Sequence, residues 1–439
     1  MLTLSDKKKI SGQIWRLAIP NIISSITVPL LSLVDVGLAG HLPSSSAIGA
    51  VAIASGALNT IFWLFGFLRM GTTGFVAQNF GAENWRTIAR LLIRGIALAC
   101  LCGGMLLFAK PLVLLFAKFI AQTETDIATQ AGAYLDIALL GAPAAMLIYV
   151  FNGWFIGMQN TKIPMITAIM INVCNIALSF FLVRNQHYGV EGLAMGTVIA
   201  QYIGLLFFAT MAIVSYKPIL KLGEWNDLWA TDGLREFLFT GKDIFIRSAM
   251  LSAVTLFFTY ASVREGEIVV AANTLLLQFF NIFSYLADGF AYAGEALSGR
   301  YMGMKDKEKL RNVIRQLFVI GAILAAIASA VYLIMPQHIL LLLSDNELVI
   351  KTSLKYVVWT GIIPLAGFSA FLWDGIFVGT TYSKGLLTSM VFACAVFFIT
   401  YYALQWILAN HALWLAFCLY LSIRGGVQAI LWHRKGITR

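Results

Sequence analysis

Two stretches decide how this chain is organised: residues 152–162, "NGWFIGMQNTK", and residues 374–384, "DGIFVGTTYSK". They lie 222 positions apart and share two glycines, a phenylalanine and a lysine at matching places. The same offset carries Asn59 onto Asn281 and Gly81 onto Gly303. One unbroken offset at three separate places indicates an internal repeat, so the chain is predicted to consist of two similar halves.

The composition is typical of a membrane protein. Of the 439 residues, 59% are hydrophobic and only 12% are charged, and the mean hydropathy is +0.82. A soluble protein of this length is about 25% charged. The five cysteines lie inside apolar segments and have no paired C-x-x-C spacing, so we expect neither a disulfide framework nor a metal site.

Apolar stretches of about 20 residues predict transmembrane helices. The twelve predicted spans are 14–39, 47–73, 88–109, 130–158, 163–183, 190–214, 236–262, 267–295, 311–335, 352–379, 384–408 and 411–432. Each half then holds six spans, and because six is even, both halves insert with the same orientation as a parallel repeat. The predicted fold class is an all-α polytopic membrane protein with twelve transmembrane helices in two six-helix lobes.

The longest polar stretch separates the sixth and seventh spans. It contains the residues from Tyr216 onward, "YKPILKLGEWNDLWATDGLRE". The predicted domains are therefore an N-terminal lobe (1–214), a cytoplasmic linker (215–235) and a C-terminal lobe (236–439).

The positive charge marks one face of the membrane. With the N-terminus inside, cytoplasmic segments carry most of the 31 lysines and arginines, including those near the C-terminus, Arg424, Arg434, Lys435 and Arg439. This asymmetry predicts that both termini are cytoplasmic. It also accounts for the net charge of +10 without a nucleic-acid partner.

Asp35 is the only ionisable residue between positions 17 and 40 in the first span. A carboxylate at such depth costs about 2.5–3.5 kcal/mol. At 100° per residue it shares one helix face with other polar side chains, namely Asn21, Ser24, Ser25 and Ser32, so this face should point into the bundle or a wet cavity. The alternative is an interfacial carboxylate near the outer end of the helix, satisfied by a cap or a water.

Two prolines make the first span a candidate hinge. Pro20 and Pro29 remove backbone donors inside the helix, which favours a bend or local unwinding.

Further polar residues of the N-terminal half form the predicted surroundings of Asp35. They are Tyr134, Asn152, Asn172, Asn175, Ser179, Thr197 and Gln201. Hydroxyl and amide groups can bond either form of a carboxyl group, as proton coupling requires. The alternative is that these side chains only join helices by hydrogen bonds.

The second half does not reproduce the acid, because Asp35 maps onto Phe257. Asp288 and Asp374 are secondary candidates in that half. Each lies near the inner end of its span and could line an inner cavity or pair with a basic neighbour.

Several segments resemble the multidrug and toxic compound extrusion (MATE) family. They are "LAIPNIISSITVPLLSLVDVGLAGHL" (17–42), "RMGTTGFVAQNFGAEN" (69–84) and "NGWFIGMQNTKIP" (152–164). The prokaryotic DinF-like branch is the most similar, through "LADGFAYAGEALSG" (286–299) and "WDGIFVGTT" (373–381). The likeness covers essentially the whole chain and implies an exporter of cationic or amphiphilic compounds that exchanges them for protons or sodium ions.

The resemblance places the coupling carboxylate at Asp35. It also assigns family positions to Tyr134, Asn152, Asn175 and Thr197. Many relatives have a second acid where this chain has Ser179, and the sodium-coupled branch resembling NorM uses a span-7 glutamate that is absent between residues 243 and 265. Both departures favour protons over sodium.

The sequence thus predicts a proton-coupled multidrug efflux antiporter in a bacterial inner membrane, acting through Asp35 and bending of the first span. Alternatives are a sodium-coupled exporter and a lipid-linked precursor flippase of the same superfamily. The chain has no GxxxxGK[ST] motif, so we expect an ion gradient to drive transport and no cofactor to be bound. A monomer is expected. An enzyme is not expected, since the sequence has neither HExxH nor GxSxG.

Overall fold

The structure is a computed structural model that describes residues 4–40, 46–120, 125–186, 188–224, 227 and 233–436. Within these ranges the side chains of residues 4–5, 28–33, 35–36, 116–120 and 125 are outside the description.

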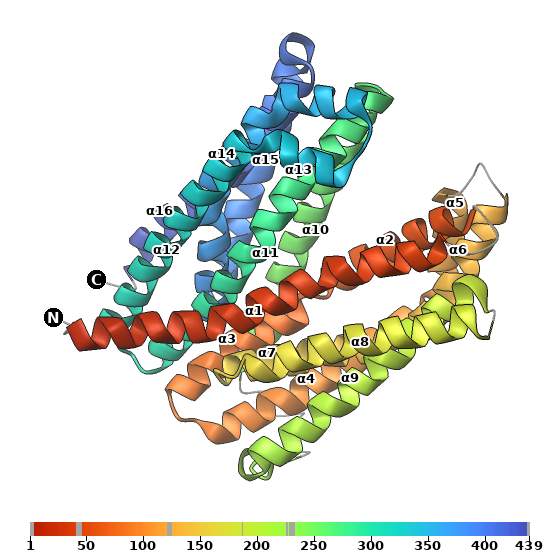
Figure 1. Ribbon diagram of the computed structural model, residues 1–439. Helices are drawn as coiled ribbons and strands as arrows, with labels where there is room; N and C mark the ends of the chain where they lie inside the picture. The colour runs from red at the N-terminus through yellow and green to blue at the C-terminus, as the bar shows by residue number, and fades with distance from the viewer. Residues whose placement is uncertain are drawn as a thin grey trace. The chain divides into compact units, whose positions relative to one another are not determined.

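The described chain is helical throughout (Figure 1). In order, the helices are α1 (Leu4–Ala39), α2 (Ser46–Leu64), α3 (Phe67–Gly81), α4 (Trp85–Phe108), α5 (Lys110–Ile120), α6 (Thr125–Ala138), the 3-10 turn η1 (Leu139–Gly141), α7 (Ala142–Gly157), α8 (Lys162–Arg184), α9 (Gly189–Leu220), α10 (Leu234–Arg264), α11 (Glu267–Gly303), α12 (Lys307–Ile334), α13 (Pro336–Leu343), α14 (Glu347–Gly379), α15 (Ser383–Leu408) and α16 (Asn410–Lys435).

Eleven helical segments among the described residues are long and apolar enough to cross a membrane. They coincide with the second to twelfth predicted spans. The first predicted span, 14–39, lies in α1, but the side chains of part of this helix are outside the description. A count of twelve is compatible with these findings and stays a prediction.

The described chain forms two compact units of similar size. One, here the N unit, is Ile23–Gly241; the other, the C unit, combines Met1–Ile22 with Lys242–Arg439. The division falls inside α1 and inside α10, so each of these helices begins in one unit and ends in the other.

The backbone repeats itself between the units at the same offset of 222 residues. Glu83 and Lys305 both have positive φ angles, 55° and 56°, and so do Gln159 and Thr381, at 61° and 52°. Residues other than glycine rarely take this conformation. Each of these joints connects two long helices, so the chain turns in the same way at equivalent places of both halves.

Helix starts are repeated as well. The side chain of Asn84 accepts a hydrogen bond from the backbone N–H of Thr87 at the start of α4. Asp306 does the same for Lys309 at the start of α12. An N-cap of this kind satisfies one of the free N–H groups at a helix start.

Two glycines let helices touch backbone to backbone. A Cβ atom on Gly153 of α7 would collide with the carbonyl oxygen of Arg69 in α3, and one on Gly375 of α14 would collide with that of Ala291 in α11. All four residues match at the offset of 222. The glycines that mark the repeat in the sequence are therefore packing residues, as small residues often are between membrane helices.

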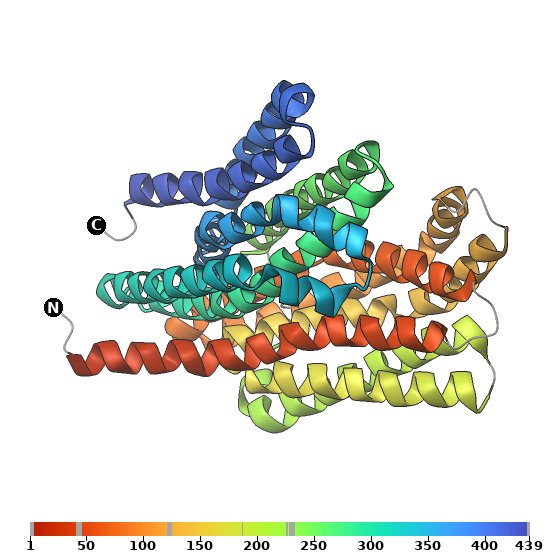
Figure 2. The ribbon, with the colours of Figure 1, turned by 45° about the horizontal axis from the view of Figure 1, so that its top comes forward.

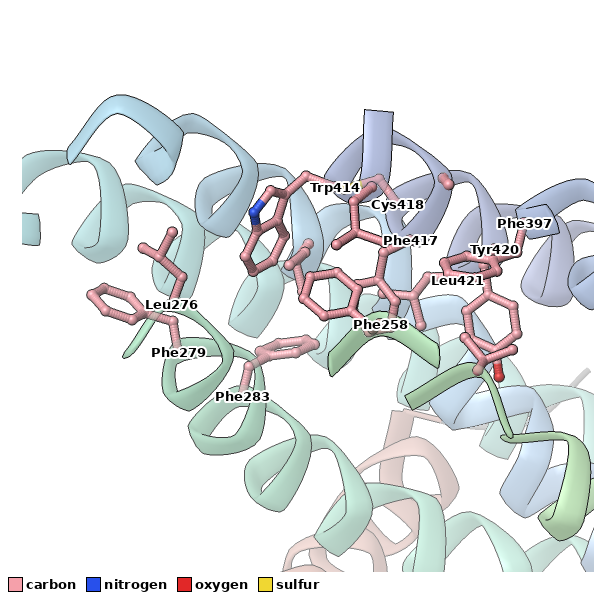
Figure 3. Close-up of a cluster of buried hydrophobic side chains, with 14 of the residues drawn as sticks. Phe258, Leu276, Phe279, Phe283, Phe397, Trp414, Phe417, Cys418, Tyr420 and Leu421 are labelled. Atoms are coloured by element: carbon pink, nitrogen blue, oxygen red, sulfur yellow. The ribbon is translucent and has the colours of Figure 1, made fainter. Parts of the chain in front are cut away.

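The two units have different interiors. Within the N unit, α8 and α9 lie side by side, and α7 packs on α3 and α4 (Figure 1). In the C unit, α14 contacts α11, α12 and α16, and α15 pairs with α16 (Figure 2). Figure 3 shows the C-unit core, where Phe258, Phe283, Trp414 and Phe417 from three helices form an aromatic cluster. Edge-to-face pairs such as Phe258 with Trp414 add about 0.5–1.5 kcal/mol each.

Candidate ion-coupling site

The polar face of α1 is turned inward where its side chains are described. Asn21 is buried, and its Nδ2 donates to the carbonyl oxygen of Leu17 at 2.9 Å. Ile19, Ile23 and Ile26, on the opposite face, are exposed. This is the orientation that the sequence pattern predicts for a helix with one lipid-facing side.

The predicted coupling residue lies in α1, but its side chain is not described. The same holds for Ser32 and Pro29. The backbone of all three belongs to the helix, as does that of Pro20. The roles of Asp35 in coupling and of the two prolines as hinges therefore stay predictions.

Three of the predicted site residues come together between α8 and α9. Asn175 donates through Nδ2 to Thr197 Oγ1 at 2.8 Å, and Ser179 Oγ is 3.5 Å from Asn175 Oδ1. The hydroxyl of Thr197 donates in turn to the carbonyl oxygen of Leu193. Asn175 and Ser179 are almost completely buried, so this network is set by the protein and not by solvent.

A fourth predicted residue connects this region to α1. Asn172, three residues before Asn175 and on the same helix face, donates through Nδ2 to the carbonyl oxygen of Thr27 at 3.2 Å. The bond reaches α1 two residues before Pro29 and two helical turns before Asp35. It links α8 to the part of α1 in which the sequence predicts bending.

Asn152 and Gln201 each have a buried oxygen without a protein hydrogen-bond partner among the described residues. The atoms are Asn152 Oδ1 in α7 and Gln201 Oε1 in α9. Gln201 Oε1 points at Gly141, where a side chain would collide with it. An unsatisfied buried acceptor is costly and marks a position where a ligand or water can bind.

Tyr134 of α6 has a different environment. It is 3% exposed and packs in a cluster of the N-unit core with Ala131, Leu135 and Val51. Tyr134 therefore contributes to the packing of the N-unit core.

Asp374 lies in a buried ion cluster of the C unit. Its Oδ2 atom is paired with the guanidinium groups of both Arg247, from α10, and Arg424, from α16, the latter at 3.3 Å. Its Oδ1 atom accepts from Gln428 Nε2 at 2.6 Å. Both carboxylate oxygens are thus engaged by donors of the protein.

Asp288, the other secondary candidate, lies in α11 and is partly exposed. Its charge acts on Tyr285 and on Arg424, and it has contacts of its own.

The partners of Asp374 do not follow from the sequence. The charge pattern places Arg424 among the cytoplasmic residues, and in the structure this side chain is only 3% exposed and lies in the middle of α16. Gln428, one turn further, is completely buried. Arg424 and Gln428 lie four residues apart in an apolar span, and this spacing is the feature of the sequence that indicates a polar contact there.

The family model for MatE matches this chain twice, at residues 20–181 and 244–405. The chain belongs to the MatE family. The two matches begin 224 residues apart, close to the offset of 222 found between the halves, so both units of this MatE protein carry one copy of the repeat.

Curated relatives extend over most of the MatE chain. It is 37% identical to the DNA damage-inducible protein F of Escherichia coli (strain K12) over 437 residues, which cover 99% of this chain and 93% of the relative. It is 23% identical to a probable multidrug resistance protein NorM of Thermotoga maritima over 360 residues, 80% of this chain and 76% of that protein.

Solved MATE structures share the fold. An outward-facing multidrug resistance MATE transporter of the MOP superfamily superimposes with a TM-score of 0.88 at 18% identity, covering 98% of this chain and 96% of the other. A MOP superfamily transporter from Pyrococcus furiosus gives the same score at 17% identity, with the same coverage. This MatE protein is thus a multi-pass, all-helical membrane transporter with the MATE fold.

Proposed function

We propose that this MatE protein is a secondary active efflux antiporter that exports lipophilic, cationic compounds in exchange for protons. It would act in a bacterial inner membrane with both termini cytoplasmic, and Asp35 would carry the exchanged proton. The substrate class is supported by relatives named for multidrug resistance and by the small number of charges in the spans.

The observation that carries the proposal is an aromatic cluster in the C unit. At the offset of 222, the counterparts of Asp35, Asn175 and Ser179 are Phe257, Phe397 and Tyr401. The ring of Phe257 packs on those of Phe397 and Tyr401, with centroids 5.9 and 5.2 Å apart. Because the two repeats share their backbone joints, Asp35 is expected beside Asn175 and Ser179 in the N unit.

Such surroundings suit a carboxyl group that changes protonation. The Asn175 amide and the Ser179 and Thr197 hydroxyls can each donate to a carboxylate or accept from a carboxylic acid. A buried carboxyl group among neutral partners has its proton affinity raised by desolvation. Asp35 would then bind and release a proton within the working range of the membrane gradient.

The contacts of Asp374 support the choice of Asp35. Asp374 is held by two guanidinium groups and an amide, so it lacks the neutral surroundings proposed for the exchanging carboxyl group. Its oxygens are also occupied, which disfavours it as a sodium ligand. These contacts of Asp374 favour Asp35 as the site of proton exchange.

The proposed cycle starts with protonation of Asp35 from outside. The neutral acid loses its interactions with α8, and α1 bends between Pro20 and Pro29, where backbone donors are missing. The bend shrinks the binding cavity of the N unit and expels the substrate, and release of the proton to the cytoplasm restores the first state.

Purified protein in liposomes tests this cycle. Export of a fluorescent lipophilic cation is measured with a proton gradient alone or a sodium gradient alone, for wild type and Asp35→Asn. Asp136→Asn is the matched control, because Asp136 is a largely exposed aspartate paired with Lys110 at 2.7 Å. We expect proton-driven export that is lost in Asp35→Asn and kept in Asp136→Asn.

Two results would overturn the proposal: export driven by sodium alone, or normal proton-driven export by Asp35→Asn. Substrate binding to Asp35→Asn separates two versions of the mechanism. Binding is retained if α1 bending expels the substrate, and it is lost if substrate and proton compete directly for the carboxylate.

A further inference from the structure

Two arginines of the C unit share one carboxylate atom and are buried with it. Arg247 and Arg424 are 4% and 3% exposed, and both pair with Oδ2 of Asp374. Burying a guanidinium group costs several kcal/mol unless its charge and its N–H groups find partners. Asp374 contacts both guanidinium groups, and Asp288 adds a second negative charge near Arg424.

The donors of the cluster are not used up. Nε of Arg247 and Nε of Arg424 are buried and have no hydrogen-bond partner in the described part of the chain. The remaining contacts of Arg424 hold the side chain in place without adding negative charge. Its Nη1 donates weakly to Tyr420 at 3.5 Å, and its guanidinium lies over the rings of Phe371 and Tyr420, at 5.5 and 5.7 Å.

The charged and polar groups around the two arginines come from three helices. Asp374 (α14) and Gln428 (α16) are in direct contact with the cluster. Asp288 (α11) acts on Arg424 through its charge. The Nε atoms of Arg247 and Arg424 have no hydrogen-bond partner among the described residues. The unmet requirement of the site is thus an acceptor for these two Nε–H groups.

We propose that the C unit binds a small monovalent anion, of the size and charge of chloride, between Arg247 and Arg424. The small size follows from burial: with side chains 5% and 3% exposed, the arginines leave no room for a bulky anionic headgroup. An anion accepting from the two Nε–H groups forms charge-assisted hydrogen bonds with both arginines, which are stronger than bonds to a neutral acceptor. The site is independent of proton exchange at Asp35 and belongs to the C unit alone.

The anion has a structural consequence for the unit. Arg247 and Arg424 come from α10 and α16, so a bound anion joins these two helices at one point. It should stabilise the C unit against unfolding by mass action, in proportion to its occupancy.

Thermal unfolding of the purified protein in a neutral detergent tests the proposal. Sodium chloride is titrated against sodium gluconate at constant ionic strength. We expect a saturable rise of Tm with chloride in wild type and in Arg434→Gln, an exposed arginine of the same helix, and no rise in Arg424→Gln. Asp374→Asn, which removes the competing carboxylate, should lower the half-saturating chloride concentration about tenfold.

Crystals of the wild type grown in bromide give a measurement that does not depend on variants. An anomalous peak within hydrogen-bond distance of both Nε atoms is expected. Equal Tm values in chloride and gluconate, together with no bromide peak at the cluster, would show that water fills the site and would overturn the proposal. A chloride effect that survives in Arg424→Gln would overturn it too.

Discussion

Asn152 and Asp374 occupy the same position in the two repeats, five residues before the ends of α7 and α14, and their partners differ completely. Asn152 Oδ1 is buried without a hydrogen bond from the described residues, whereas both oxygens of Asp374 are held by Arg247, Arg424 and Gln428. The same repeat position thus holds an amide with an unsatisfied oxygen in the N unit and a carboxylate with both oxygens bonded in the C unit.

Asp374→Asn should destabilise the protein strongly. Removing one partner of a buried ion cluster costs about 3–5 kcal/mol, because the remaining charges stay buried without compensation. We expect a clear fall of Tm in chloride-free detergent buffer. Asp345→Asn is the control, since Asp345 is exposed at the end of α13 and has no ion pair among those described; similar melting of both variants would contradict the importance of the cluster.

The bond between Asn175 and Thr197 should be functional. Asn175→Ala and Thr197→Val each remove one partner of this hydrogen bond. The double variant should impair export no more than the more severe single variant, which corresponds to a coupling energy of about 0.6–1.7 kcal/mol between the two residues. The measurement is the pH at which proton-driven export is half-maximal.

Asn273→Ala in the C unit is the control for that cycle. Asn273 is buried and fully bonded to Ser262, Asn410 and Trp414, so its loss should lower Tm and leave the pH profile of export unchanged. Strictly additive effects of the Asn175 and Thr197 variants would argue for a packing role alone.

The repeat glycines should tolerate no side chain. Gly153→Ala and Gly375→Ala each push a methyl group into a carbonyl group of the neighbouring helix, which costs about 1–3 kcal/mol or prevents folding. Gly104→Ala in α4 has open space around its Cβ position and serves as the control. Tm values measured in one detergent should fall for the first two variants only.

Asp227 should fix the linker to α4. Its Oδ2 atom accepts from the backbone N–H of Glu224 and its Oδ1 atom from Arg90 Nε, both at 3.0 Å. The Glu224 hydrogen bond, together with the charge of Arg90, outweighs burial and holds the pKa of Asp227 below its usual range.

The sign of the pH dependence follows from this lowered pKa. The carboxylate stabilises the fold at every pH above the unfolded pKa of about 3.9, and the effect is lost as pH falls through the folded pKa. Asp227→Asn should therefore lower Tm by a constant amount between pH 5 and pH 8. Glu224→Gln, which affects only an exposed pair with Arg86, should have a smaller effect; a difference that disappears at pH 6 would speak against this assignment.

Helix positions were predictable from the sequence because a membrane-spanning segment must be apolar over about 20 residues. The repeat was predictable because glycines such as Gly153 and Gly375 cannot be replaced where backbones touch. Local breaks were not: predicted span 47–73 is interrupted by a turn at Phe65 and Gly66, which no apolar pattern records.

Side-chain pairing was predictable only within one helix. The shared face of Asn172, Asn175 and Ser179 follows from their spacing, and the structure places them in one polar region. The ion pair of Arg424 with Asp374 joins two helices, so it depends on tertiary packing. The rule that relates charges to a membrane side carries no information about this pairing.

The shared joints of the halves, with left-handed residues at Glu83 and Lys305 and again at Gln159 and Thr381, amount to a record of gene duplication. A six-helix ancestor would have worked as a pair of identical chains. After fusion, selection could act on one copy without the other. The side chains diverged, while the turns between the helices kept their left-handed residues.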